Sequence, residues 1–168
     1  MNLNNYIRDV QDFPKEGILF KDISPLLSNP EAFKFTVDKM AEDIKWADAI
    51  VWLDARGFIF WAALSYKLGI PFVPVRKPGK LPYETKSIDY DLEYWSNTLE
   101  IHTDAVKKWD NVVIVDDLLA TGWTAAATIE LVEWLWANVL SCHFVIHLEF
   151  LKWEEKLNND NIYSLLKY

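Results

Sequence analysis

Glycine is the residue that this chain has least of, relative to what is usual. Average usage near 7% would give about 12 glycines in a chain of this length, and only five occur among the 168 residues. Tryptophan deviates the other way, with nine residues where about two are ordinary. The two deviations together indicate an exchange between these two residue types.

Other absences exclude whole classes of protein. No run of about 18 uncharged apolar residues occurs, so no membrane-spanning helix is expected. The N-terminal segment has no apolar h-region, so we expect no secretory signal and a cytoplasmic location. A single cysteine, Cys142, excludes an internal disulfide, and its apolar neighbours favour a buried hydrophobe. The net charge of −8 argues against nucleic-acid binding, which needs a field of Lys and Arg.

Short apolar runs alternate with helical segments along the chain, and its length fits one domain, residues 1–168. Asn29, Pro30 and Glu31 predict the N-cap and first turn of a helix, and Gly69 predicts a helix end. Strands are predicted at 49–53, 71–75, 112–115, 139–146 and 162–166, further helices over 58–68 and 124–136, and a hairpin from runs around 90–94 and 98–101. This pattern predicts an α/β fold, a mostly parallel twisted sheet flanked by helices on both faces.

The strongest signal for chemistry follows the predicted strand 112–115. Asp116 and Asp117 stand at its end, and adjacent carboxylates are costly unless they bind hydroxyl donors, such as those of a ribose, or a cation. The turn 120–124, Ala-Thr-Gly-Trp-Thr, opens onto a helix start, where free N–H groups and the helix dipole favour a phosphate. The alternative is that the acids merely end a strand and the turn merely reverses the chain. A Walker loop is excluded because no Lys precedes Thr124.

Together, these apolar residues, two acids and T-G-x-T turn resemble the phosphoribosyl pyrophosphate (PRPP) signature of type I phosphoribosyltransferases. Four more segments resemble the adenine phosphoribosyltransferases of that family, in order and spacing: 12–27 (DFPKEGILFKDISPLL), 53–60 (LDARGFIF), 73–82 (VPVRKPGKLP) and 92–102 (LEYWSNTLEIH). The resemblance covers nearly the whole chain. It implies the type I phosphoribosyltransferase fold, with a small hood at about residues 1–28 packed on the core and a flexible hairpin and loop.

The resemblance implies a purine salvage enzyme, a glycosyltransferase that moves the 5-phosphoribosyl group from PRPP to adenine and gives AMP and pyrophosphate. One alternative is a phosphoribosyltransferase for another purine, hypoxanthine or guanine. Another is a non-catalytic regulator of the same fold that senses PRPP. Mg²⁺ is implied as a cofactor bound with PRPP or pyrophosphate, because the sequence shows no dedicated metal cage. A homodimer is implied as well.

The resemblance also implies a role for particular residues. Asp116 and Asp117 would bind the ribose hydroxyls, and the 5-phosphate would be bound by Ala120, Thr121, Gly122, Trp123 and Thr124. Pyrophosphate would be bound by Arg56, Arg76, Lys77 and Lys80, and adenine by Leu19, Phe20 and Lys21. Glu93 would be the catalytic acid or base near the purine, with Tyr94 in the same flexible loop. A guanidinium fork suits a diphosphate, and a surface salt bridge is the alternative for Arg56. Solvated charges are the alternative for the basic loop and for Glu93, and a core position is the alternative for Phe20.

Tryptophan stands at seven positions where the family usually carries glycine: Trp52, Trp61, Trp95, Trp109, Trp123, Trp136 and Trp153. Trp46 joins them, and Trp134 is less clear. Glycine at all nine positions would raise its share to about 8%, close to the usual 7%. We hypothesise that these codons are UGA, read as glycine in the source organism. True tryptophan enrichment is the alternative, but an indole at Trp123 would obstruct a phosphate turn and Trp61 would overfill a core site.

Overall fold

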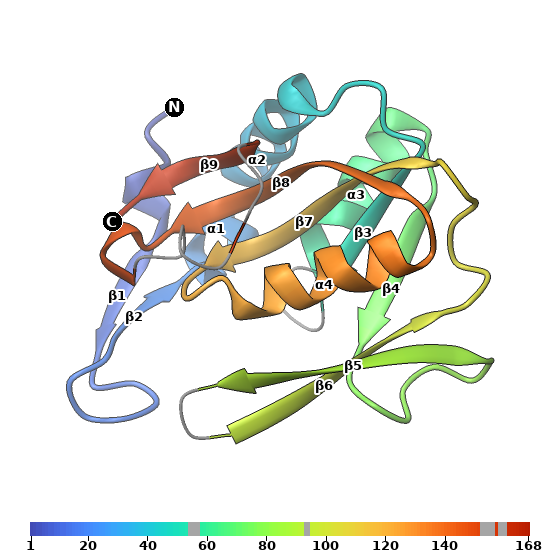
Figure 1. Ribbon diagram of the computed structural model, residues 1–168. Coiled ribbons are helices and arrows are strands. Elements are labelled where there is room, and N and C mark those ends of the chain that lie inside the picture. Colours follow the sequence, from blue (N-terminus) through green and yellow to red (C-terminus); the bar gives the residue numbers. More distant parts are fainter. Residues whose placement is uncertain (54–57, 93–94, 152–156, 158–160) are drawn as a thin grey trace.

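The computed structural model describes residues 1–53, 58–92, 95–151, 157 and 161–168, so Arg56, Glu93, Tyr94 and Trp153 lie outside the described residues. Its main feature is a seven-stranded sheet in the order β5-β6-β4-β3-β7-β8-β9 (Figure 1). The strands are β3 (Ala49–Leu53), β4 (Phe72–Arg76), β5 (Thr85–Leu92), β6 (Trp95–His102), β7 (Asn111–Leu119), β8 (Asn138–His147) and β9 (Ile162–Lys167).

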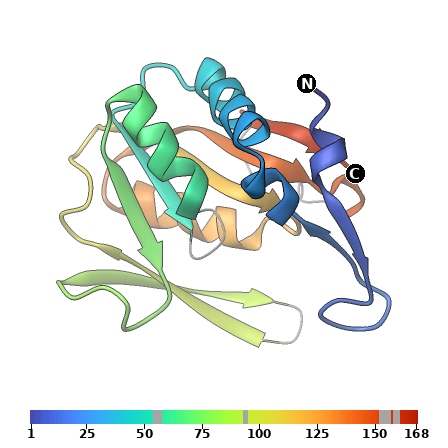
Figure 2. The ribbon, with the colours of Figure 1, turned by 180° about the vertical axis from the view of Figure 1, so that it is seen from behind.

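Five neighbouring strands of this sheet, β4, β3, β7, β8 and β9, run parallel, and the β5–β6 hairpin joins β4 in antiparallel pairing. Helix α4 (Trp123–Trp134) covers one face, whereas α2 (Pro30–Asp43) and α3 (Phe58–Leu68) cover the other (Figures 1 and 2). The predicted mostly parallel sheet flanked by helices is confirmed. Within the described ranges, no helix combines the length and apolar character needed to cross a membrane.

The central parallel strands β3, β7 and β8 bury residues on both of their faces, as their near-continuous apolar sequences require. In β7, Val112 and Ile114 belong to the cluster beneath α4, and Val113 and Val115 belong to the cluster beneath α2 and α3. This alternation is the ordinary period of a strand. Cys142 of β8 is fully buried, and burial raises the pKa of its thiol to about 12, which confirms it as a small core residue.

Local signals in the sequence place the ends of two helices. The Asn29 side chain accepts a hydrogen bond of 2.9 Å from the N–H of Ala32, and α2 begins at Pro30 as predicted. Gly69 follows the last residue of α3 with φ of 69°, and its N–H donates to the carbonyl of Ser65 at 2.9 Å. Both predicted caps are confirmed.

The bounds predicted for one strand and one helix are wrong. The strand predicted at 112–115 continues to Leu119, because Asp116 pairs with Phe144 of β8 and Leu118 with Ile146, so the two acids lie within the strand. The helix predicted over 124–136 begins at Trp123 and ends at Trp134. After this helix the backbone turns at Trp136, whose φ is 65°.

The first 28 residues form elements that the sequence pattern did not predict. They are the 3-10 helix η1 (Leu3–Tyr6), the antiparallel strands β1 (Arg8–Gln11) and β2 (Leu19–Asp22), and helix α1 (Ser24–Ser28); a second 3-10 helix, η2 (Glu149–Leu151), lies near the C-terminus. The β1–β2 and β5–β6 hairpins both extend on the side towards which the arrows of β4 and β7 point (Figure 1).

Trp52 of β3 and Trp61 of α3 are both fully buried between the sheet and that helix. Their rings stack with centroids 4.1 Å apart and an interplanar angle of 16°. The structure accommodates both indoles by stacking them face to face.

A buried histidine, His143, lies on β8. His143 is 2% exposed, its Nε2 lies 2.8 Å from the hydroxyl of Ser141, and its ring stacks on Tyr163 at 4.9 Å between centroids. Burial lowers the pKa of His143 from 6.5 to about 4, because the charged imidazolium is poorly solvated there.

This lowered pKa makes stability depend on pH. Between pH 6.5 and about 4 the unfolded chain takes up a proton on His143 that the folded chain does not, so the free energy of unfolding falls as pH falls through that window. The expected loss is on the order of 3 kcal/mol across the window. Urea unfolding of the parent and His143→Gln across this range measures it. If the free energy of unfolding depends on pH equally in the two proteins, this pH dependence does not come from His143.

Candidate functional site

The turn between β7 and α4 encloses a small cavity of about 80 Å³ at the carboxyl end of the strand. Ligands of open α/β sheets bind at this edge. The cavity is lined by Asp116, Leu118, Leu119, Ala120, Thr121, Gly122, Thr124, Ala125 and Phe144. The acid and the small-residue turn that the sequence singled out therefore meet at one place.

Gly122 gives this turn its shape. It is the N-cap of α4 with φ of 80° and ψ of −11°, a left-handed conformation that glycine adopts without a Cβ penalty. Its carbonyl accepts the N–H of Ala126 at 2.9 Å, so the helix begins directly behind the cavity. The first turn of α4, all of it described, contains no acidic residue. Its N–H groups and the positive end of the helix dipole thus favour an anion.

The two acids of the turn have different surroundings. Asp116 is half-buried and lines the cavity, whereas Asp117 is 5% exposed and is absent from the described residues that line it. The backbone N–H of Asp117 donates to Oδ1 of Asp116 at 2.8 Å. Successive side chains of a strand point to opposite faces, so the position of Asp116 within β7 turns its carboxylate towards α4 and the cavity.

Two residues from distant parts of the chain complete this region. The hydroxyl of Tyr90 on β5 lies 3.5 Å from Oγ1 of Thr124, which links the hairpin to the first turn of α4. Phe144 of β8 contributes an apolar wall to the cavity. Sequence reasoning missed both as site residues, because their approach depends on strand order; Phe144 carried no local signal, and Tyr90 stood only as a hairpin aromatic. Trp123, the first residue of α4, is half-buried.

The predicted basic loop follows β4. Arg76 is the last residue of that strand and is half-buried, whereas Lys77 and Lys80 are exposed. The loop turns at Gly79, with φ of 74°, and the Gly79 N–H donates to Oε2 of Glu100 at 3.2 Å. Two lysines thus stand in solvent beyond the carboxyl end of β4, the same edge of the sheet as the cavity.

The segment predicted to bind adenine lies on β2. Leu19 is 45% exposed, and Phe20 meets Phe13 edge to face with centroids 5.0 Å apart. The ammonium of Lys21 lies 2.7 Å from Oδ1 of Asp9 and 3.8 Å from the centroid of the Tyr168 ring. In this structure the charge of Lys21 is therefore balanced within the N-terminal segment.

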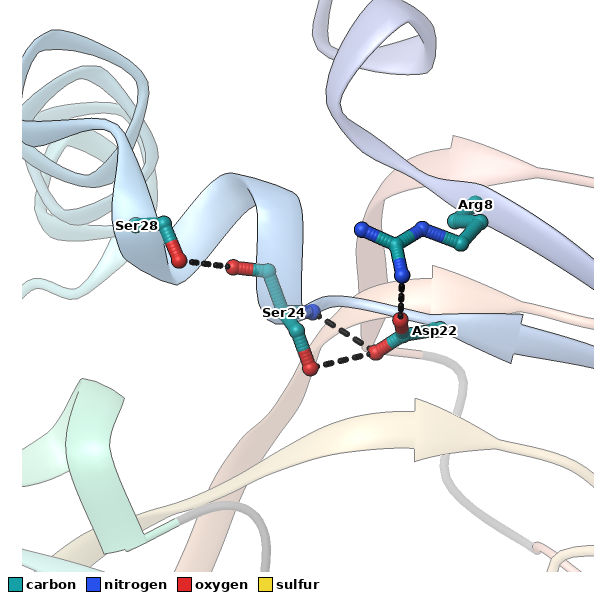
Figure 3. Close-up of polar contacts among 4 residues, drawn as sticks. All are labelled: Arg8, Asp22, Ser24 and Ser28. Atoms are coloured by element: carbon teal, nitrogen blue, oxygen red, sulfur yellow. Dashed lines mark hydrogen bonds and ion pairs between the residues drawn. The ribbon is translucent and has the colours of Figure 1, made fainter.

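A polar cluster fixes the end of β2 to the start of α1 (Figure 3). One carboxylate oxygen of Asp22 accepts from the N–H and hydroxyl of Ser24 at 2.8 and 2.6 Å, and the other lies 3.7 Å from Arg8 of β1. The hydroxyl of Ser28 donates to the carbonyl of Ser24 at 2.8 Å. These contacts hold the segment 19–21 at a defined position relative to the helices.

Metal ligands are sparse in the described part of the chain, where no group of three or more His, Cys, Asp or Glu side chains could hold an ion. Asp116 nevertheless offers carboxylate oxygens at the cavity. Mg²⁺ is commonly held by one or two carboxylates together with substrate phosphates. The residues present fit an ion that binds in this way.

Comparisons with known proteins agree with this geometry. A family model described as a phosphoribosyl transferase domain matches residues 26–157. The fold and the turn before α4, together with this match, define a phosphoribosyltransferase.

Relatives specify the family further. The chain is 54% identical to the adenine phosphoribosyltransferase of Carboxydothermus hydrogenoformans, and the match covers 100% of each. The solved adenine phosphoribosyltransferase of Thermoanaerobacter pseudethanolicus has a TM-score of 0.95 at 49% identity, covering 99% of this chain and 98% of that one. That of Saccharomyces cerevisiae, complexed with an imino-altritol bisphosphate and adenine, has a TM-score of 0.90 at 44% identity, covering 98% and 96%. The chain belongs to the adenine phosphoribosyltransferase family.

Proposed function

We propose that Asp116, Asp117 and the turn 120–124 hold the ribose 5-phosphate of PRPP in the reaction of this family. In that reaction the enzyme transfers the 5-phosphoribosyl group to adenine, and the products are AMP and pyrophosphate, which is a step of purine salvage. The observation that carries the assignment is the cavity where Asp116 meets the start of α4. The yeast relative was solved with adenine, which supports adenine as the base.

The reaction is a displacement at the anomeric carbon of the ribose. A ring nitrogen of adenine forms the new bond while the bond to pyrophosphate breaks, and pyrophosphate leaves with the electron pair. Positive charge develops on the sugar ring, so the protein acts by orienting both substrates and stabilising charge. The carboxylates of Asp116 and Asp117 hold the ribose hydroxyls, and Glu93 accepts the proton that the purine loses.

The leaving pyrophosphate needs positive charge. Arg56, Arg76, Lys77 and Lys80 supply it from the protein, and bound Mg²⁺ would neutralise the diphosphate further. Asp116 lines the cavity, and its carboxylate would share such an ion with the substrate. The β5–β6 hairpin, whose Tyr90 already lies beside Thr124, closes over the site and excludes water that would otherwise hydrolyse the activated sugar.

Removal of the lysine charges tests this arrangement. Lys77→Ala combined with Lys80→Ala is expected to raise KM for PRPP about three- to tenfold with a smaller change in kcat, because exposed charges contribute modest, salt-screened energies. Initial rates at low and high ionic strength measure the effect. Lys107→Ala, at an exposed lysine of the β6–β7 connection, is the matched control. An unchanged KM for PRPP in the double variant would contradict a role for this loop.

Substrate choice distinguishes the remaining alternatives. Turnover with adenine, and at least about 100-fold lower kcat/KM with hypoxanthine and guanine, is expected of this family's site. Preference for an oxopurine would favour the other purine enzyme. PRPP binding without turnover of any purine would favour the non-catalytic regulator.

We also propose that the enzyme is a cytoplasmic homodimer, as the resemblance to its family implies. Light scattering of the purified protein measures the oligomeric state, and cell fractionation measures the location. A monomer that retains full transferase activity would contradict the dimer.

A further inference from the structure

Three tryptophans adopt a backbone conformation that ordinarily belongs to glycine. Trp46, Trp109 and Trp136 have φ values of 63°, 72° and 65°. A Cβ atom makes this left-handed region costly for L-residues, whereas glycine enters it freely. Only a few per cent of non-glycine residues adopt it, so the eight described tryptophans would give roughly 0.3 such cases.

Trp136 occupies the position in a helix cap where glycine is usual. Its N–H donates to the carbonyl of Glu133 at 2.9 Å, and the N–H of Ala137 donates to the carbonyl of Val132 at 3.3 Å. These two bonds after the last residue of α4 make a Schellman motif, and its left-handed residue is most often glycine. The backbone of α4 therefore ends as though residue 136 had no Cβ.

The end of α3 has a glycine at the position that corresponds to Trp136 at the end of α4. Gly69 follows that helix with φ of 69°, and the N–H groups of Gly69 and Ile70 both donate to the carbonyl of Ser65, at 2.9 and 3.3 Å. All four glycines that the structure describes have positive φ, between 69° and 84°. Trp136 thus shares its conformation and its position after a helix with a glycine of this same chain.

Trp109 stands in a turn with the same requirement. The N–H of Asp110 donates to the carbonyl of Lys107 at 3.1 Å, which makes Trp109 the third residue of a β-turn. Positive φ at this third residue, and not at Lys108 before it, is the pattern of a type II turn, which favours glycine there. The N–H of Trp109 also donates to the carbonyl of Trp136 at 2.7 Å, so the two turns touch through their backbones.

The indole side chains offer little burial in return for this strain. They are 88% exposed at Trp46, 69% at Trp109 and 60% at Trp136. The rings of Trp109 and Trp136 lie 6.5 Å apart and tilted. An open hollow of about 490 Å³ lies beside Trp136, and its lining includes Trp134 and Trp136.

We propose that residues 46, 109 and 136 are glycine in the protein that the source organism makes, because that organism reads UGA codons as glycine. A reassigned codon acts wherever it occurs, so every tryptophan of this chain that UGA encodes is glycine too. Conversion of all nine would bring glycine to about 8% of the chain, near the usual 7%. This inference rests on backbone geometry and composition, and it is independent of the proposed function.

The gene and the native protein provide the direct test. UGA is expected at codons 46, 109 and 136, and mass spectrometry of peptides from the native protein is expected to show glycine at these three positions. A UGG codon or a tryptophan-containing native peptide at any of them would overturn the proposal.

A recombinant chain with the printed sequence provides the physical test. Trp136→Gly is expected to raise Tm by about 2–4 °C, and Trp109→Gly by a similar amount. Trp136→Ala is the matched control, because it removes the indole but keeps the Cβ, and it should recover less than half of that rise. Gly69→Ala, at the comparable cap of α3, should lower Tm. If Trp136→Gly is no more stable than Trp136→Ala, the backbone does not require glycine and the proposal fails.

Discussion

Replacement of Gly122 by valine is expected to lower kcat/KM for PRPP by at least about 100-fold. The N-cap of α4 has φ of 80°, which a β-branched residue reaches only with strain. The strained turn would move the N–H groups that hold the phosphate, and a misplacement of about 1 Å can cost about 10²-fold in rate. Initial rates at varied PRPP concentration measure the loss. The parent protein for this comparison is the chain with the printed sequence or, if that chain is inactive, its Trp123→Gly variant.

Two controls separate the effect on catalysis from the effect of strain alone. Gly122→Ala adds the smallest side chain and is expected to give an intermediate loss. Gly69→Val places the same side chain at another positive-φ glycine, after α3 and outside the cavity lining. It is expected to lower Tm while kcat/KM stays within about twofold at a temperature where it remains folded, a change well below the 10²-fold expected at the turn. An unchanged KM for PRPP in Gly122→Val would show that this turn does not bind the phosphate.

Sequence patterns predicted the parts of the fold that depend on local chemistry. The apolar run 49–53 lies between polar neighbours, and β3 has these same bounds. Asn29 before Pro30 determines where α2 begins, because its side chain accepts the N–H of Ala32. Gly122 was placed correctly in the turn before a helix, and its φ of 80° is a conformation that glycine adopts freely.

Contacts between distant segments could not be predicted in this way. Asp116 and Asp117 look like the end of a strand, yet backbone pairing with β8 carries the strand past them to Leu119. Tyr90 reaches Thr124 because the β5–β6 hairpin packs beside α4. Lys21 meets Tyr168 only because the two ends of the chain lie together. Each of these contacts depends on sheet order, which no single segment encodes.

The second large effect is expected at the acidic pair. Asp116→Asn and Asp117→Asn keep the size of each side chain and remove its charge. A hydrogen bond to a charged group contributes about 1.5–3 kcal/mol, so each variant is expected to lower kcat/KM for PRPP about 10- to 100-fold. Asp116 lines the cavity, so its variant should weaken PRPP binding with little change in Tm. Asp117 is buried, so its variant should change Tm as well as activity.

The combination of kinetics with thermal unfolding distinguishes a role at the site from a role in the fold. Asp104→Asn, at an exposed carboxylate after β6, is the matched control and should change neither quantity. Because neighbouring groups that bind one ligand are not independent, the double variant should lose less than the product of the two single losses. Full activity in both single variants would show that the ribose is held elsewhere. Full activity in Asp117→Asn alone would confine the ribose contact to Asp116, the carboxylate that the structure places in the cavity.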